Sequence, residues 1–422
     1  MERSYTSRER MRLALNHQQP DRAPVDLGST LVTGIQASAY TILKQSLKIS
    51  DGDVKVYDPF QMLAEVSERV KDRFGVDTYG VQLPINLFGY RNENWKPFRM
   101  FDGNEVLVSG NFQYDVLPNG DMVQYPRGDR SVSPSGKMPK DGYYFDVIVR
   151  QLPIDEGKLD PKRWVDQTYS LYTEEDLRYL EETSRRYYEN TEYSLIGNFW
   201  GAGFGDIALV PGPHILRPEV IRDPEEWYVS MVTRSGYISD IFGYQFELGM
   251  KNVALYREAV GDRIDVITMS GTDFGAQNGP FISPDVYREV FKPLHRRMND
   301  WVHGNTGWKT FYHTCGSVVA FLDDFCEAGV DIINPVQVSA AGMDPQFLKK
   351  NYGDRLVFWG GAVNPQGTLA FGSPEEVREE AARNIRTFSE GGGYIMGNVH
   401  NIQSNVPPEN IIAMFDALEM SG

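Results

Sequence analysis

The stretch KTFYHTCGSVVAFLDDFCEAGVDIINP, residues 309–335, carries the pattern that decides the fold. Residues 310–312 predict a buried strand, and residues 318–328 carry apolar side chains at helical spacing, followed by Gly329 as a helix stop. Residues 332–335 then predict a second strand. A strand, a helix and a strand joined by short loops form a parallel βαβ unit, so the stretch predicts an α/β fold with a parallel sheet.

The same alternation repeats from about residue 174 to the end of the chain. Further strands are predicted at residues 193–199, 264–270, 357–360 and 394–397. Further helices are predicted at residues 225–246, 284–302, 345–352, 374–389 and 408–418. A helix is also predicted at residues 61–74, because apolar side chains recur there every four residues, at Met62, Val66, Val70 and Phe74.

Two more predicted strands, near Val25 and Thr78, bring the count to eight. The sequence therefore predicts an α/β protein with a (β/α)8 TIM barrel, an N-terminal extension and a β-rich insertion. We expect residues 1–422 to form a single barrel domain. A doubly wound open sheet is the alternative, but neither a dinucleotide-binding glycine fingerprint nor a phosphate-binding loop follows any predicted strand.

Residues 85–170 lack this alternation and form the predicted insertion. Residues 105–108 and 112–116 are rich in strand formers, and Pro118-Asn119-Gly120-Asp121 is typical of a hairpin turn. We expect this β-rich region to cover one end of the barrel.

The composition of the chain limits the kinds of partner and the cellular compartment that we expect for the protein. The formal net charge of −16 argues against a nucleic-acid or anionic-membrane partner, since such surfaces require a basic face. The chain has only two cysteines, Cys315 and Cys326, and its N-terminal segment has no apolar run typical of a signal peptide. No stretch is apolar enough for a membrane span. We therefore expect a cytoplasmic protein.

His313-Thr314-Cys315-Gly316 contains the sharpest candidate site. Residues two apart on a strand point to the same side, so His313 and Cys315 can face one point at the carboxyl end of the barrel. Thiolate and imidazole are ligands that Zn²⁺ prefers, and a catalytic zinc has three protein ligands and an open position. The plainer alternative is a buried cysteine beside a hydrogen-bonded histidine.

His400 follows the last predicted strand and is the candidate third ligand, with Asp273 as an alternative oxygen ligand. Asp273 is also the candidate catalytic base, unless its carboxylate only caps a loop. A purely structural hydrogen-bonding role for His400 is the alternative to ligation. Cys326 lies among apolar residues of a predicted helix, which favours a place in the core.

Four further residues are candidates for substrate binding. Asn334 and Gln337 suit hydrogen bonding to a polar ligand, or to their own loop. Phe199 and Trp200, with Phe204, lie among glycines and predict an apolar wall, unless they pack in the core. No nucleophile elbow is present, and no glycosidase-like carboxylate pair stands out.

Several segments resemble the uroporphyrinogen decarboxylase superfamily, over roughly residues 7–80 and 190–420. They are Ser7-Arg8-Glu9-Arg10, residues 16–26, Ile282-Ser283-Pro284, His313-Thr314-Cys315-Gly316, residues 327–331 and residues 407–411. The resemblance implies a (β/α)8 barrel. It also implies one of two activities, because the superfamily contains porphyrinogen decarboxylases and zinc methyltransferases that work with corrinoid proteins.

The two branches of the superfamily carry different motifs at positions that can be compared with this chain. The decarboxylases carry an arginine motif after the first strand, whereas residues 26–31 here contain no arginine. The methyltransferases carry His-x-Cys after one strand, matched by His313 and Cys315, and a further cysteine near the last strand, where His400 stands here. The resemblance thus favours the methyltransferase branch, with Zn²⁺ as cofactor.

We therefore expect zinc-dependent methyl transfer between a small substrate and a corrinoid protein. The corrinoid would belong to a partner, because no D-x-H-x-x-G signature occurs in the chain. The aromatic residues at 199, 200 and 204 favour a methoxylated aromatic donor. The alternatives are a metal-free decarboxylase, with Asp273 or Asp26 stabilising a protonated pyrrole, and a non-catalytic binding subunit. A homodimer is left open.

Overall fold

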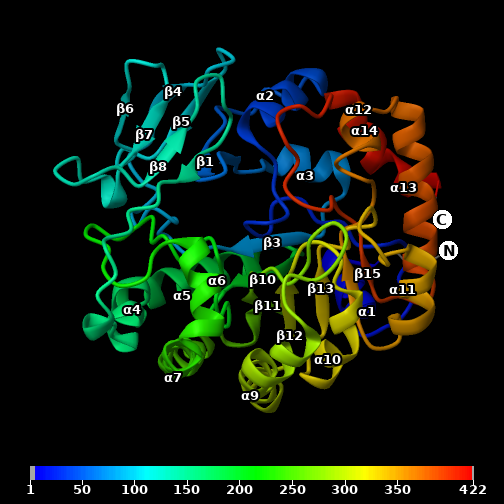
Figure 1. Ribbon diagram of the computed structural model, residues 1–422. Helices are drawn as coiled ribbons and strands as arrows, with labels where there is room; N and C mark the ends of the chain where they lie inside the picture. Colours follow the sequence, from blue (N-terminus) through cyan, green and yellow to red (C-terminus); the bar gives the residue numbers. More distant parts are fainter. Residues whose placement is uncertain (1–4, 421–422) are drawn as a thin grey trace.

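The computed structural model describes residues 5–420 of the chain. At its centre is a parallel sheet of seven strands in the order β15-β14-β13-β12-β11-β10-β3, so that each strand pairs with its neighbour along the chain once the inserted strands are set aside (Figure 1). The strands are β3 (Thr78–Val81), β10 (Ser194–Asn198), β11 (Val266–Ser270), β12 (Lys309–His313), β13 (Ile332–Asn334), β14 (Val357–Trp359) and β15 (Tyr394–Ile395).

A short segment around Val25 joins the two edges of this sheet. On one side the Met396 amide donates to the Pro24 carbonyl at 2.8 Å and the Asp26 amide to the Met396 carbonyl at 2.9 Å. On the other side the Asp77 amide, just before β3, donates to the Val25 carbonyl at 2.8 Å. The segment thus takes the place of an eighth strand. The predicted barrel fold with extra elements is confirmed.

The barrel interior is a packed core of large apolar side chains, as expected for this fold. It contains Met11, Leu15, Ile196, Val266, Phe311, Ile332, Val357, Trp359 and Ile395, each 2% exposed or less. Met11 and Leu15 come from helix α1 (Ser7–Leu15), the predicted N-terminal extension, which closes the end of the barrel where the strands begin. Phe311 faces this interior, so His313, two residues later on β12, lies on the same side at the other end.

Helices pack around the outside of the sheet, with α7, α9 and α10 below the strands and α11 to α14 beside them in Figure 1. The helices are α1, α2 (Ala37–Ser46), α3 (Glu68–Phe74), α4 (Pro161–Thr168), α5 (Glu174–Asn190), α6 (Pro224–Thr233), α7 (Ser235–Val260), α8 (Pro284–Val286), α9 (Lys292–Asn305), α10 (Leu322–Glu327), α11 (Pro345–Tyr352), α12 (Thr368–Phe371), α13 (Pro374–Ser389) and α14 (Pro408–Asp416). No helix among residues 5–420 is both long enough and apolar enough to cross a membrane.

Two predicted helices have different bounds. The predicted helix at 225–246 is divided at Arg234, whose non-helical backbone separates α6 from α7. The predicted helix at 61–74 is wrong in its first half: β2 (Leu63–Ala64) pairs with β1 (Val56–Asp58) there, and α3 begins only after Ser67. Met62 is still buried, but it lies in the turn before β2 rather than on a helical face.

Six short strands lie between β3 and α4 and form two antiparallel sheets, seen at the upper left of Figure 1. One sheet pairs β4 (Lys96–Arg99) with β5 (Glu105–Val108), and the other contains β6 (Tyr114–Val116), β7 (Met122–Gln124), β8 (Gly136–Met138) and β9 (Asp146–Val147). Because they follow β3 in the chain, these sheets emerge from the carboxyl end of the barrel.

Candidate metal centre

The turn that follows β12 brings Cys315 back beside His313. Cys315 Sγ lies 3.4 Å from His313 Nε2, and the Cys315 amide donates to Asp273 Oδ1 at 2.6 Å. Gly316 then takes a φ of +83°, and a Cβ built on it would lie 2.4 Å from the carbonyl carbon of Gly275. Only glycine therefore permits this close approach between the loops after β11 and β12.

His400 completes a cluster of three possible ligands. It comes from the loop after β15, and its ring centre lies 5.2 Å from that of His313. The ligand atoms of His313, Cys315 and His400 all lie within 4.8 Å of one another. Ligands about 2.0–2.3 Å from a tetrahedral zinc are themselves separated by somewhat under 4 Å. Small side-chain movements would therefore bring this donor set, one sulfur and two nitrogens, to zinc distances.

The ionisation states of the three groups suit a metal site. Burial lowers the pKa of His313 to about 4 and that of His400 to about 3, so both rings are neutral at pH 7 and keep a free lone pair. Burial, and then the charge of Asp273, raise the pKa of the Cys315 thiol well above its ordinary value. The thiol is thus protonated until a cation displaces its proton.

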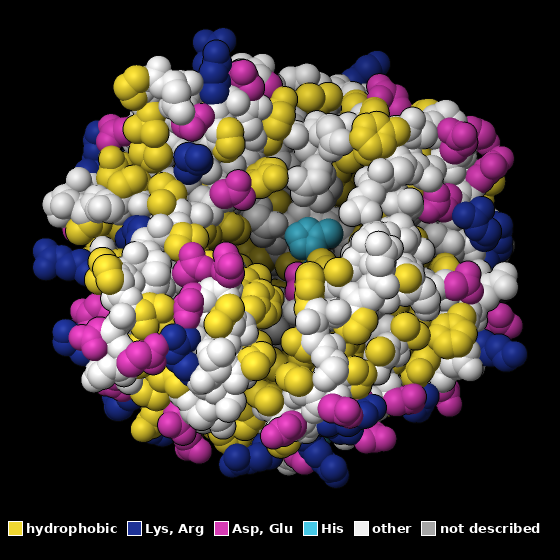
Figure 2. All heavy atoms as spheres, viewed as in Figure 1, with side chains coloured by type: hydrophobic (Ala, Val, Ile, Leu, Met, Phe, Trp, Pro, Cys, Tyr) yellow, Lys and Arg dark blue, Asp and Glu magenta, His cyan; other side chains and the backbone are white. Residues whose placement is uncertain are grey.

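Two of the three candidate ligands are partly exposed at the surface. Figure 2 shows a hollow near the middle of the viewed face, with a histidine side chain in it and hydrophobic and acidic side chains around it. His313 is buried, while Cys315 and His400 are partly exposed. This arrangement leaves one side of the cluster open to a small molecule, as a catalytic metal site requires.

Asp273 and a residue that the sequence analysis missed, Asp206, add negative charge to this end of the barrel. Asp273 Oδ1 lies 3.9 Å from His313 Nε2, close enough for the alternative role of an oxygen ligand. Burial, together with the charge of Asp273, raises the pKa of Asp206 to about 7. Among residues 5–420, no lysine or arginine forms an ion pair with either carboxylate. The only sequence signal that could have identified Asp206 as a candidate site residue is its position in the loop after β10.

Asn334 and Gln337 lie beside the cluster and hold its parts in place. Asn334 Oδ1 lies 2.7 Å from His313 Nδ1, and Gln337 Oε1 accepts from the Gly316 amide at 2.9 Å. Gln337 Nε2 also donates to Gln277 Oε1 at 2.8 Å. Both side chains are therefore engaged by the protein itself, and their predicted contact with substrate remains a prediction.

The predicted aromatic wall is divided between two faces of the sheet. Phe199 is buried against Tyr172 and Tyr256, away from the cluster. Trp200 packs on the barrel interior, with its ring centre 6.4 Å from that of Phe311. Both Trp200 and Asp206 lie within 4 Å of the space that a Cβ on Gly271 would fill. Trp200 is thus the aromatic residue of the predicted wall that lies at the carboxyl end. Phe204 is fully buried.

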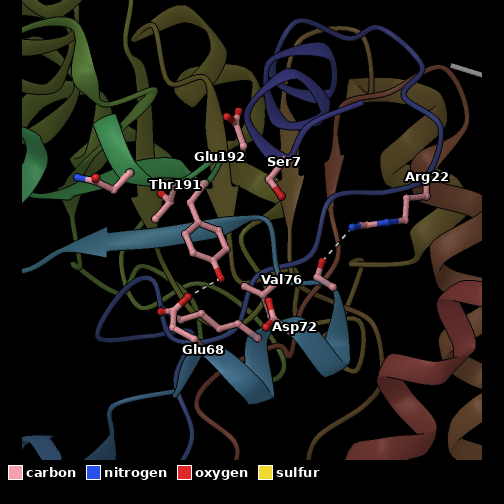
Figure 3. Close-up of a pocket in the computed structure, with 11 residues that line it drawn as sticks. Ser7, Arg22, Glu68, Asp72, Val76, Thr191 and Glu192 are labelled. Atoms are coloured by element: carbon pink, nitrogen blue, oxygen red, sulfur yellow. Dashed lines mark hydrogen bonds and ion pairs between the residues drawn. The ribbon is translucent and has the colours of Figure 1, made fainter. Parts of the chain in front are cut away.

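A second cavity, of about 400 Å³, lies at the opposite end of the strands. Glu68, Asp72 and Glu192 line it together with Arg22 and Lys71. Figure 3 shows Glu68, Asp72, Glu192 and Arg22 around the start of the sheet. Its two basic side chains are already paired, Arg22 with Asp77 at 2.7 Å and Lys71 with Glu68 at 2.8 Å. Nothing in this cavity resembles the metal-ligand cluster.

Comparisons with known proteins agree with the sequence resemblance. Residues 258–420 match the profile of the family described as uroporphyrinogen decarboxylase (URO-D). Curated uroporphyrinogen decarboxylases match over shorter segments: that of Psychromonas ingrahamii is 33% identical over 76 residues, and that of Pseudoalteromonas atlantica is 23% identical over 176 residues. These matches cover 18% and 39% of the chain, and 21% and 47% of the relatives' length. The chain thus spans less than half the length of these relatives.

The fold as a whole is shared with a solved structure. A methyltransferase from Methanosarcina mazei superposes with a TM-score of 0.50 at 14% sequence identity, covering 99% of both chains. At this identity the likeness shows the fold. It extends across the entire chain, including the parts that the family profile does not reach.

Proposed function

We propose that this chain, whose residues 258–420 match the uroporphyrinogen decarboxylase family profile, is a zinc-dependent methyltransferase that moves a methyl group between a small substrate and a corrinoid protein. His313, Cys315 and His400 would hold the zinc. The observation that carries the proposal is the convergence of these three ligand atoms within 4.8 Å at the carboxyl ends of the strands, where barrel enzymes keep their active sites.

The donor set defines what the site would do. Bound zinc would act as a Lewis acid on the leaving oxygen of a methylated donor, or would hold a thiolate acceptor. The chain's own groups orient the ligands: Asp273 fixes the Cys315 amide, and Gln337 fixes the Gly316 amide. Trp200 offers an aromatic surface at the same end of the barrel, so methoxylated aromatics are the first donors to screen. The corrinoid would be carried by a separate protein docked over the hollow.

The charges around the site disfavour an acidic porphyrinogen as substrate. Residues 26–31 contain no arginine, and no lysine or arginine in the described part of the chain forms an ion pair with Asp206 or Asp273. Asp26, one of the groups considered for a decarboxylase, is fully buried and accepts hydrogen bonds from Thr78, Ser29 and Trp359. It has no access to a substrate in this structure. A polycarboxylate would therefore meet repulsion rather than a cationic grip.

The test is metal analysis of the protein purified without added metal. We expect about one zinc per chain, lost in His313→Ala and in Cys315→Ser and reduced in His400→Ala. His303→Ala, which removes a histidine outside the cluster, should keep its zinc and serves as the matched control. A wild-type protein that binds no zinc even after reconstitution would exclude this mechanism.

If zinc is present, the second step is an assay of methyl transfer from methoxylated aromatics to a corrinoid protein. Loss of transfer together with zinc in His313→Ala would support the methyltransferase. Zinc binding with decarboxylation of a porphyrinogen, and without methyl transfer, would contradict it.

A further inference from the structure

Asn334 occupies the strand between the metal-ligand strand and Trp359. On β13 it lies directly beside His313 of β12, and its amide reaches the other neighbouring strand, β14. Its side chain has no exposed surface. Asn334 therefore cannot meet a substrate in this structure, although it touches a residue that would hold the metal.

The orientation of the Asn334 amide follows from its second partner. The Asn334 side chain lies 3.1 Å from the backbone carbonyl oxygen of Trp359. A carbonyl oxygen only accepts hydrogen bonds, so the nitrogen of the amide, Nδ2, must face it. The amide oxygen, Oδ1, is thereby turned towards His313, 2.7 Å from Nδ1.

This orientation decides which nitrogen of His313 carries its proton. Oδ1 of Asn334 also only accepts, so Nδ1 of His313 must be the protonated, donating nitrogen. The remaining nitrogen, Nε2, then keeps its lone pair. Nε2 is the atom that faces Cys315 Sγ at 3.4 Å, on the side of the candidate ligand cluster.

We propose that Asn334 is a positioning residue that presets His313 as an Nε2 metal ligand, in a chain of hydrogen bonds from the Trp359 carbonyl through the Asn334 amide to the ring. The proposal rests on the zinc centre described under the proposed function, and assigns Asn334 a role other than substrate binding. Partners of this kind fix the tautomer and the ring orientation of ligating histidines, and their loss weakens metal binding about 10- to 100-fold.

Trp359, at the far end of this series of hydrogen bonds, is itself held in place by buried side chains. The indole Nε1 of Trp359 donates to Asp26 Oδ2 at 2.9 Å, and Asp26 Oδ1 accepts from the Thr78 hydroxyl at 2.6 Å. All three side chains are buried in or beside the barrel interior. Strand β14, whose Trp359 carbonyl orients the Asn334 amide, is thus anchored across the barrel. The orientation of the His313 ring therefore depends on the sheet and not on a loop.

The first test needs no metal. In metal-free wild-type protein labelled with ¹⁵N-histidine, the two ring nitrogens of His313 should show the Nδ1–H tautomer at pH 7, and Asn334→Ala should lose it. Asn334→Asp, which keeps an acceptor oxygen towards His313, should restore it. Asn299→Ala is the matched control: Asn299 is an equally buried asparagine that accepts from Tyr312 and donates to Ala328, outside the cluster.

The second test is metal affinity, measured by zinc titration, with the cobalt(II) absorption spectrum as a report on ligand geometry. Asn334→Ala should bind zinc about 10- to 100-fold more weakly, while Asn334→Asp and Asn299→Ala stay near wild type. An Nε2–H tautomer in the wild type would overturn the proposal, as would unchanged zinc affinity in Asn334→Ala. If Asn334→Ala loses the Nδ1–H tautomer as expected but the wild-type protein transfers no methyl group, the proposed function is wrong and the positioning role of Asn334 is still supported.

Discussion

The carboxylates at the two ends of the barrel have opposite surroundings. At the end where the strands begin, Asp77, Asp265 and Asp331 each stand one residue before a strand, and each is paired. Asp77 accepts from Arg10 at 2.6 Å and Arg22 at 2.7 Å, and Asp265 from Arg12 at 2.8 Å. At the end where the strands finish, Asp206 and Asp273 have no lysine or arginine partner among residues 5–420, and only His313 lies near Asp273, at 3.9 Å.

The pKa values show the same contrast. Burial opposes the ionisation of Asp331, but hydrogen bonds from His303 and from the Thr310 amide together hold its pKa below the usual value. Burial raises the pKa of Asp273, and raises that of Asp206 to about 7. In a barrel enzyme the starting end contributes stability and the finishing end contributes function. The carboxylates that weaken the folded protein are therefore those beside the candidate metal centre.

The largest expected effect on stability comes from removing an ion pair at the end of the barrel where the strands begin. Asp77→Asn should lower the free energy of unfolding by about 3 kcal/mol, because it removes the fully buried carboxylate that Arg10 and Arg22 share, although Arg10 keeps its pair with Asp21. Asp273→Asn is the matched change at the other end and should alter stability by less than about 1 kcal/mol. Urea unfolding of both variants checks this. Equal destabilisation by the two would remove the contrast between the ends.

The next effect is a gain of stability at the finishing end. The folded pKa of Asp206 is raised to about 7 from 3.8, so the folded protein binds the extra proton and stability falls as pH rises through that interval. Asp206→Asn should remove this loss. We expect the free energy of unfolding at pH 8 to rise by about 1–2 kcal/mol. This is less than the full difference between the folded and unfolded pKa values would give, because the carboxyl is partly solvated.

The measurement for Asp206 is the unfolding free energy between pH 4 and pH 8. The wild-type curve should decline over this range more steeply than that of Asp206→Asn, and the two should meet near pH 4, where both side chains are neutral. Parallel curves would show that Asp206 ionises normally in the folded protein.

The smallest effect concerns the exposed rim of the starting end. His303→Ala removes the partner 2.7 Å from Asp331 and should cost about 0.5–1 kcal/mol at pH 7, since the pair is partly solvated and Asp331 keeps its bonds from Thr310. The lowered pKa of Asp331 contributes stability above pH 3.8, which is lost as pH falls through the lower folded value. The difference between wild type and variant should therefore shrink in acid. A difference that grows in acid would contradict this account.

Much of the fold could be predicted because strand and helix periodicities are local. The pattern at residues 310–335 reproduces β12, α10 and β13 closely, and alternation on β12 places His313 on the interior side. Cys315 lies beyond the strand, and the turn after β12 brings it beside His313. The helix predicted at 61–74 shows the limit: its four-residue spacing of buried side chains is also produced by a strand followed by a shorter helix. Spacing records which side chains are buried, and not what buries them.

The candidate site was predictable where ligand chemistry is distinctive and not where it depends on neighbouring strands. His313, Cys315 and His400 stand out by residue type and by their place after strands, and the structure brings them together. The sequence predicts that Asn334 hydrogen-bonds a polar ligand or its own loop, since nothing local shows that its amide is divided between β12 and β14. Asp206 lies in a loop of ordinary composition. Its unusual ionisation arises only from the folded surroundings.

The segment around Val25 has a consequence for how the chain is made. It pairs with Met396 on one side and with the residue before β3 on the other, so the barrel acquires its last neighbours only when β15 has been synthesised. Until then a growing chain presents two unpaired strand edges, which are prone to non-specific association. The same delay applies to His400. A growing chain that has not reached residue 400 can offer a metal only His313 and Cys315 of the three candidate ligands, and the full set exists only after the two distant parts of the sequence have met.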